Sequence, residues 1–241
     1  MAVDPGDREN PDFVPAHSVP SGGSVLPGTR LDGGQSGLLV LTRAVLRVTV
    51  RVLAEGGVDL EGLGNVPVQG PLLICSNHLS NFDPLVYAAL LPRVLHALTK
   101  AELYANPVMR QFLLHCNCIP VHRGAPDRVA IRAALAVLRS QGALLLFPEG
   151  HRAPAGTMLG FEPGAGYLAL RSRATVLPCA VWGTERILPK GRLWPRRGSI
   201  AVRLGAPFQP RGADPGLVSR QIRERVGALL PEQFRRSADA D

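Results

Sequence analysis

Residues 127–147 read DRVAIRAALAVLRSQGALLLF, and this stretch decides the fold class. Asp127 is a typical helix-capping residue, apolar residues follow it at helical spacing, and Gly142 stands where such a helix ends. The apolar residues 143–147 come directly after that glycine and have the length of a buried strand. A helix that leads straight into a buried strand is typical of α/β proteins.

The same alternation extends in both directions along the chain. Apolar runs of strand length occupy residues 71–75, 94–98, 118–121, 175–182 and 199–204. Helical patterns occupy residues 84–91, 106–115, 163–172 and 216–230. We therefore expect a layered α/β fold, with a mostly parallel or mixed sheet covered by helices.

The N-terminal part of the chain has a different composition. Residues 1–36 are rich in Pro, Gly, Ser and Asp, which predicts a flexible tail. Residues 38–54 read LLVLTRAVLRVTVRVLA and predict a helix bounded by glycines. We expect three parts: the tail at 1–36, a membrane-associated amphipathic helix at 37–57, and a folded domain at 58–241.

The predicted N-terminal helix carries Arg43, Arg47 and Arg51 at every fourth position, so they form one stripe. The segment is too short and too charged for a comfortable membrane span. It suits a helix that lies in a membrane surface, with its apolar sides inserted and its arginines reaching lipid phosphates. The alternative is a core helix whose arginine stripe faces water.

The charge and the aromatic content of the chain indicate which classes of partner it can bind. Lys+Arg exceed Asp+Glu by 27 − 19 = +8, which favours anionic partners such as lipids or phosphorylated substrates. Only 5% of residues are aromatic, so the stacking platforms that single-stranded nucleic acid needs are scarce, and we expect no nucleic acid partner. No secretory signal opens the chain, so we expect a reducing, cytosolic setting without structural disulfides.

Cys116, Cys118 and His122 are residue types that bind metal ions, and they lie close together in the sequence. Their side chains would share one face of a strand. Their spacing matches none of the common zinc patterns, and Pro120 interrupts that face. We expect no metal and no redox cofactor.

Polar residues follow several predicted strands, where the ligands of a parallel sheet bind. The run at 71–75 is followed by His78 and then Asp83. Histidine is the usual general base, and a carboxylate on its other ring nitrogen fixes the tautomer and stabilises the imidazolium. Ser76 and Ser80 lie near, but nothing marks either as an activated nucleophile. The simplest scheme has His78 removing a proton from a substrate hydroxyl, which then attacks an electrophile.

Two arginines suggest what carries that hydroxyl. Arg123 and Arg152 each follow a predicted strand, beside a glycine or a turn. Arginine holds phosphate through paired hydrogen bonds. The alternative is a surface ion pair, for example between Arg152 and Glu149.

Four blocks of the sequence carry a resemblance to a known family. They are NHLSNFD at 77–83, CIPVHR at 118–123, FPEGHR at 147–152 and VLPCAV at 176–181. In this order they resemble the glycerolipid acyltransferases of the 1-acyl-glycerol-3-phosphate acyltransferase type. The first and third blocks are the most specific, and the resemblance covers about residues 65–210.

The resemblance implies transfer of a fatty acyl group from acyl-CoA or acyl carrier protein to the hydroxyl of a lysophospholipid, most simply 1-acyl-glycerol-3-phosphate, giving phosphatidic acid. It makes His78 the base and Asp83 its partner. The residues that it assigns to the substrate are Asn77, Arg123, Glu149, Gly150 and Arg152. It also implies a peripheral or monotopic protein at the cytoplasmic face of a membrane.

The chain departs from the family pattern at two positions near the acceptor. His151 stands where Thr or Ser is usual, and Glu162 stands where many members have Lys. These departures leave the acceptor head group open. A lipid hydrolase and a non-catalytic membrane-binding protein with the same fold remain as alternatives.

Overall fold

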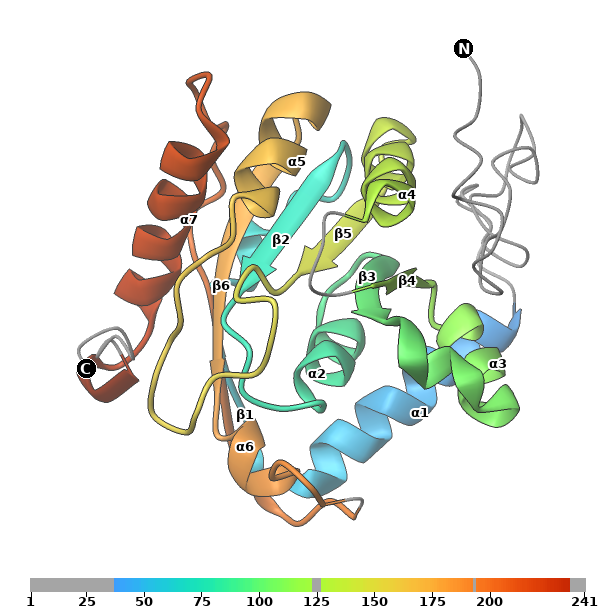
Figure 1. The fold of residues 1–241 in the computed structure, drawn as a ribbon. Coiled ribbons are helices and arrows are strands. Elements are labelled where there is room, and N and C mark those ends of the chain that lie inside the picture. Colours follow the sequence, from blue (N-terminus) through green and yellow to red (C-terminus); the bar gives the residue numbers. More distant parts are fainter. Residues whose placement is uncertain (1–36, 123–126, 193, 235–241) are drawn as a thin grey trace.

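The computed structural model describes residues 37–122, 127–192 and 194–234 (Figure 1). The predicted tail at 1–36 lies outside them. The strands are β1 (Ala54–Glu61), β2 (Leu72–Ser76), β3 (Leu95–Lys100), β4 (Cys118–Val121), β5 (Ala143–Leu146), β6 (Thr175–Trp182) and β7 (Gly198–Leu204). The helices are α1 (Gly37–Leu53), α2 (Asp83–Leu90), α3 (Pro107–His115), α4 (Arg128–Arg139), α5 (Gly164–Ser172), α6 (Thr184–Ile187) and α7 (Pro215–Leu229).

Within these residues the strands form one seven-stranded sheet in the order β1-β7-β6-β2-β5-β3-β4. The five strands from β6 to β4 are parallel to one another. β7 runs antiparallel to β6, and β1 runs parallel to β7. The sheet is therefore mixed, and the predicted α/β class is confirmed. All five parallel strands direct their carboxyl ends to the same edge of the sheet.

The central strand β2 shows why both faces of the sheet must be covered. Leu73 and Cys75 belong to a buried cluster with residues of α4, α5 and α7. Leu72 and Ile74 point to the other face, into a cluster with residues of α1 and α2. All four are 0% exposed, as expected for a continuous apolar run in a parallel sheet. Figure 1 shows the helices on the two sides.

α1 and the sheet form one continuous unit. β1 begins at Ala54, directly after the last residue of α1, so the boundary predicted at 57 falls inside a strand. Gly56 and Gly57 adopt φ angles of 72° and 88°, and the pairing of β1 with β7 shifts register there. Val50 of α1 is 2% exposed and lies in the core with α2.

The arginine stripe of α1 makes contacts that the sequence did not predict. The Arg43 guanidinium donates to the carbonyl of Leu91, and Arg47 Nε donates to that of Ala89 at 3.0 Å. These carbonyls lie at the C-terminal end of α2, where helical carbonyls lack partners and the helix dipole attracts positive charge. Neither reading of the stripe included these contacts, and the contact of the stripe with lipid phosphates stays a prediction. They join α1 to α2.

No helix within residues 37–122, 127–192 and 194–234 is long and apolar enough to cross a bilayer.

Candidate active site

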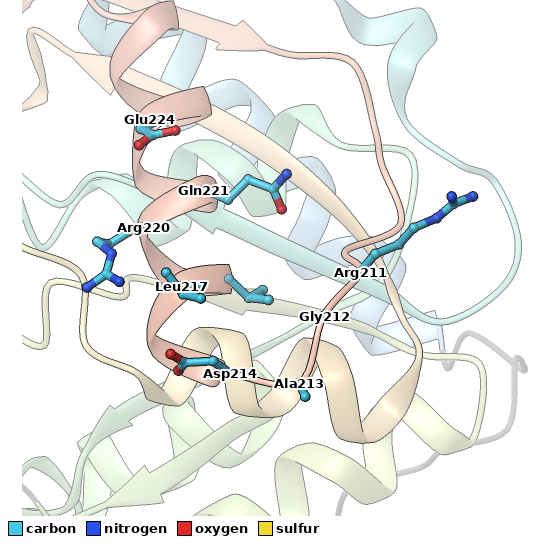
Figure 2. Close-up of a pocket in the computed structure, with 9 residues that line it drawn as sticks. Arg211, Gly212, Ala213, Asp214, Leu217, Arg220, Gln221 and Glu224 are labelled. Carbon is cyan, nitrogen blue, oxygen red and sulfur yellow. The ribbon is translucent and has the colours of Figure 1, made fainter.

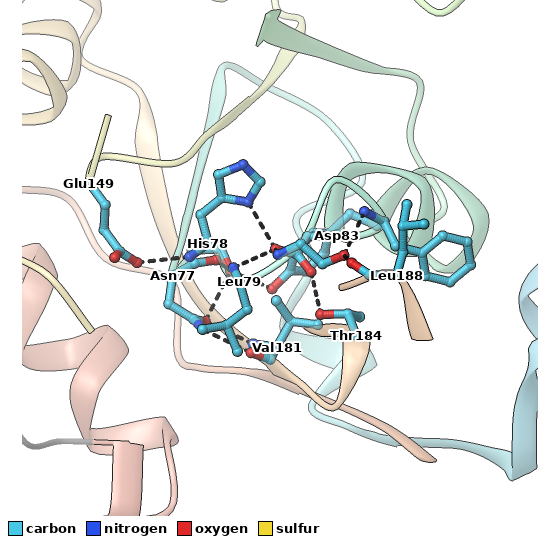
Figure 3. A network of polar contacts seen from close by, with 12 residues as sticks. Asn77, His78, Leu79, Asp83, Glu149, Val181, Thr184 and Leu188 are labelled. Atoms are coloured by element: carbon cyan, nitrogen blue, oxygen red, sulfur yellow. Dashed lines mark hydrogen bonds and ion pairs between the residues drawn. The ribbon is translucent and has the colours of Figure 1, made fainter. Parts of the chain in front are cut away.

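The loop between β2 and α2 brings the predicted base and its acid together. His78 lies just beyond the end of β2, and Asp83 is the first residue of α2, followed by Pro84. His78 Nδ1 lies 2.9 Å from Asp83 Oδ2 (Figure 3). The spacing of five positions therefore forms the turn that the sequence suggested.

The Asp83 carboxylate is fully buried and held on both oxygens. Besides His78, its Oδ2 accepts the backbone N–H groups of Leu79 and Ser80, each at 2.8 Å. Its Oδ1 accepts the hydroxyl of Thr184. A buried carboxylate is tolerated when donors replace its lost hydration, and these donors also fix the plane of the group.

The protonation pattern of His78 follows from these contacts. Because Asp83 Oδ2 already accepts two backbone N–H groups, Nδ1 of His78 must be the donor in their contact. In the neutral imidazole Nε2 is then the acceptor nitrogen, and Figure 3 shows it pointing away from Asp83. The His78 side chain is 11% exposed, and its ring stacks on Phe147 with centroids 4.1 Å apart. The geometry suits a general base reached from one open side.

Both carboxylate oxygens of Glu149 accept backbone N–H groups, one of them from His78. Its Oε1 accepts the His78 backbone N–H at 2.8 Å, and its Oε2 accepts that of Leu159 at 3.0 Å. The residue is 2% exposed, and burial raises the pKa of its carboxyl to about 7, although both N–H bonds oppose the rise. The Ala153 N–H donates to the His78 carbonyl at 2.8 Å. Both carboxylate oxygens of Glu149 thus help to fix the backbone around His78, and its predicted contact with the substrate stays a prediction.

The Asn77 side chain also bonds to backbone groups. Its Nδ2 donates to the carbonyl of Val181 at 2.8 Å, and its Oδ1 accepts the N–H of the same residue at 2.9 Å. It is 0% exposed. The side chain ties the end of β2 to β6, and its assignment to the substrate stays a prediction.

Comparison with known proteins identifies the family to which the chain belongs. The sequence profile of the family described as Acyltransferase matches residues 57–182. The chain belongs to the acyltransferase family. The matched range contains the His78–Asp83 pair and all four blocks that carried the resemblance, which is thereby confirmed.

Named relatives of this family member are 1-acyl-sn-glycerol-3-phosphate acyltransferases. The protein of that name from Cocos nucifera is 30% identical over 169 residues, covering 67% of this chain and 54% of the relative. The one from Pseudomonas aeruginosa is 28% identical over 196 residues, covering 76% of this chain and 70% of the relative. The chain thus spans about half the length of the plant protein and more of the bacterial one.

A solved structure shows the same fold. The crystal structure of the 1-acyl-sn-glycerophosphate (LPA) acyltransferase PlsC from Thermotoga maritima matches with a TM-score of 0.68 at 24% identity. The match covers 79% of this chain and 78% of that one. The sheet and helices of this acyltransferase family member are therefore shared with a solved relative.

The remaining residues predicted for the substrate lie after β4 and β5. Gly150 is exposed, has a φ of 71°, and donates its N–H to the Phe147 carbonyl at 3.1 Å in a tight turn. That amide is therefore occupied and does not serve as an open oxyanion donor. Arg152 is partly exposed on the same loop. Arg123 lies outside the described residues, so its predicted position has no structural counterpart.

Three functional contacts were missed from sequence. Thr184 holds Asp83, Phe147 stacks on His78, and the Ser80 hydroxyl donates to the Leu188 carbonyl at 2.8 Å. Residues after the strand at 175–182 stood out by position, since strand ends carry the site. Nothing in the sequence said that a hydroxyl 101 residues after Asp83 would reach its carboxylate.

Two hollows on the surface lie away from the His78–Asp83 pair. One, of about 400 Å³, lies beside the first turns of α7 and includes Arg211, Asp214 and Leu217 (Figure 2). The other, of about 540 Å³, is mostly apolar and lies along α3. Among the described residues, no three His, Cys, Asp or Glu side chains gather to hold a metal ion.

Proposed function

We propose that this protein transfers a fatty acyl group from an acyl thioester, acyl-CoA or acyl carrier protein, to the free hydroxyl of 1-acyl-glycerol-3-phosphate. The product is phosphatidic acid. The observation that carries the proposal is the His78 imidazole, whose Nδ1 is locked to a buried carboxylate while Nε2 remains available. The names of the relatives supply the acceptor.

The proposed chemistry needs one base and no covalent enzyme intermediate. His78 Nε2 takes the proton of the acceptor hydroxyl as its oxygen attacks the thioester carbonyl. The tetrahedral intermediate collapses and expels the thiolate, which takes the proton back from the imidazolium. Asp83 stabilises that imidazolium throughout. Base catalysis of this kind contributes about 10²–10⁴-fold to the rate.

Positive charge for the acceptor phosphate is assigned to Arg123 and Arg152. Arg152 is partly exposed and follows the Glu149 loop that holds the His78 backbone. Arginine suits this role because its planar group donates paired hydrogen bonds to phosphate oxygens.

One experiment tests the activity. The purified chain is incubated with an acyl thioester carrying a labelled acyl group and with lysolipids of different head groups, while thiol release and lipid products are followed together. We expect thiol release matched by labelled phosphatidic acid, with 1-acyl-glycerol-3-phosphate as the best acceptor. Thiol release with free labelled fatty acid would instead indicate a hydrolase.

The proposal includes a membrane surface, because both the acceptor and the product are lipids. The face of α1 opposite the core is apolar: Leu41, Val45, Val48 and Val52 lie at helical spacing and are 56–62% exposed. Arg51 is exposed beside this stripe. An apolar stripe flanked by positive charge suits a helix lying on an anionic bilayer.

α3 extends the same kind of surface. His115 Nε2 lies 3.1 Å from the Thr42 hydroxyl, so α3 is tied to α1 (Figure 1). Val108, Met109 and Phe112 of α3 are 79%, 40% and 42% exposed. We assign these two helices to a bilayer, and we place it at the cytoplasmic face because all four cysteines are unpaired thiols.

A further inference from the structure

Thr184 makes a contact that the family blocks do not include. It is the first residue of α6, its hydroxyl donates to Asp83 Oδ1, and both residues are 0% exposed. His78 and two backbone N–H groups all bond to Oδ2 (Figure 3). Among the described residues, Thr184 is therefore the hydrogen-bond partner of Oδ1.

The fold fixes the position of Thr184 closely. Gly183, just before it, has a φ of 88°, and a Cβ there would lie 2.0 Å from the Ser199 carbonyl oxygen. Only glycine permits this approach of the chain to β7. At the other end of α6, Ile187 is 0% exposed and the Leu188 carbonyl accepts the Ser80 hydroxyl. The short helix is thus held against the β2–α2 loop at both ends.

The chemical consequence concerns rotation of the carboxylate. Rotation of the Asp83 carboxylate about its Cβ–Cγ bond moves both oxygens and would weaken its contact with His78, and three hydrogen bonds to Oδ2 resist it from one side. The Thr184 hydroxyl holds the second oxygen, so the carboxylate plane stays aimed at Nδ1. Thr184 touches neither the imidazole nor the open side where a substrate would lie.

We propose that Thr184 is a positioning residue that keeps Asp83 aligned with His78 during proton transfer, and this rests on the proposed role of His78 as base. Its effect falls on turnover and not on substrate binding. The chemical step suffers when Asp83 is misaligned, because the imidazolium then loses its counter-charge.

Kinetics of position 184 variants test the inference. Thr184→Val keeps the side-chain shape and removes the donor, and we expect kcat to fall about tenfold with both KM values within about twofold of wild type. Thr184→Ser restores the hydroxyl and should return kcat to within about threefold of wild type. Ile187→Val is the control, because it trims a buried side chain on the same helix without touching Asp83. An equal loss of kcat in Ile187→Val would assign the effect to loosening of α6 and overturn the inference.

A double-mutant cycle makes the test specific to Asp83. In Asp83→Asn the carboxylate is already lost, so adding Thr184→Val should lower kcat by much less than the roughly tenfold expected in wild type. Multiplicative effects of the two changes would show that Thr184 acts elsewhere. Thr184→Ala serves if the valine variant fails to fold, as judged by circular dichroism, and normal kcat in a folded variant lacking the hydroxyl would also overturn the inference.

The test of Thr184 and the test of the proposed function can be told apart by comparing Thr184→Val with His78→Ala. If His78→Ala is inactive while folded Thr184→Val turns over normally, the positioning role alone is contradicted. If His78→Ala still transfers acyl groups, the base assignment fails and the inference fails with it.

Discussion

Glu149 shows how one buried carboxyl group can serve a site through its contacts with the backbone. Both of its oxygens accept backbone N–H groups, one of them from His78 itself. Burial nonetheless raises the pKa of this carboxyl to about 7. A raised pKa in the folded state means that the folded chain binds this proton more tightly than the unfolded chain does. Its stabilising contribution is complete below about pH 4.5 and is lost as the pH rises through 7.

We expect Glu149→Gln to remove this pH dependence. From pH 4.5 to 8, the unfolding free energy of wild type should fall by about 3 kcal/mol relative to that of the glutamine variant. Urea denaturation of both proteins across this range measures the difference. A constant difference between them would mean that Glu149 titrates normally.

Arg152 is the described residue to which we assign the acceptor phosphate. Arg152→Ala should raise the KM for 1-acyl-glycerol-3-phosphate, because a charge-assisted hydrogen bond contributes about 1.5–3 kcal/mol, or roughly 10- to 150-fold in kcat/KM. Uncharged lysolipid acceptors and the acyl thioester should be affected much less. Equal losses for charged and uncharged acceptors would make Arg152 structural.

Individual side chains also mark the limit of sequence reasoning. His78 and Asp83 could be predicted because five positions after a buried strand allow one local turn. The sequence could not predict the backbone hydrogen bonds of Asn77 and Glu149, because their partners include Val181 and Leu159, which are distant in sequence. These partners come together only when β2, β5 and β6 align.

Among the elements, buried strands and longer helices could be predicted almost to the residue. Strands such as β6 are continuous apolar runs, and α4 has a capping Asp127 whose side chain accepts two helix N–H groups. β1 could not be predicted, because it lies at the sheet edge, is partly exposed and contains two glycines. α6, with four residues, is too short to carry a period.

α1 has one face that packs in the core and an opposite face that is exposed and apolar. Its buried side packs on α2 and carries Val50 into the core, so deleting the helix would expose core residues that it covers. Its opposite stripe can be changed without that penalty. We expect the triple variant Val45→Gln, Val48→Gln and Val52→Gln to bind phosphatidylglycerol–phosphatidylcholine vesicles at least about tenfold more weakly, because less apolar surface can be inserted.

A matched control uses equally exposed apolar residues on other parts of the molecule. Val68, Val129 and Leu217 are 75%, 60% and 57% exposed. Changing these three to Gln should leave vesicle co-sedimentation unchanged. Equal vesicle binding by wild type and the α1 variant would contradict the proposal that α1 lies on a bilayer. Loss of a dimer in the α1 variant, seen by light scattering, would assign the stripe to a second copy of the chain.

At the scale of the whole molecule, two buried titratable groups have opposite effects on how stability changes with pH. Burial lowers the pKa of His96 on β3 to about 4, so its contribution to stability is lost as the pH falls below about 6.5. Glu149 contributes the opposite trend over much of the same range. These two contributions therefore oppose each other, and that of Glu149 is isolated by the difference between variant and wild type.

The arrangement of the whole molecule also explains why one edge of the sheet holds the chemistry. Five parallel strands end there, and loops that follow β2, β5 and β6 converge on the backbone or side chain of the His78–Asp83 pair. The same sheet is joined through α2 to α1, whose outer stripe we assign to the bilayer.

The central claim is that His78 removes the proton of an acceptor hydroxyl in acyl transfer. Single-turnover transfer from a labelled acyl thioester to 1-acyl-glycerol-3-phosphate, measured for wild type, Asp83→Asn and His78→Ala at equal vesicle binding, tests it most directly. We predict labelled phosphatidic acid from wild type, slow formation by Asp83→Asn, and a loss of about 10²–10⁴-fold in folded His78→Ala. Transfer by folded His78→Ala at the wild-type rate would contradict the account.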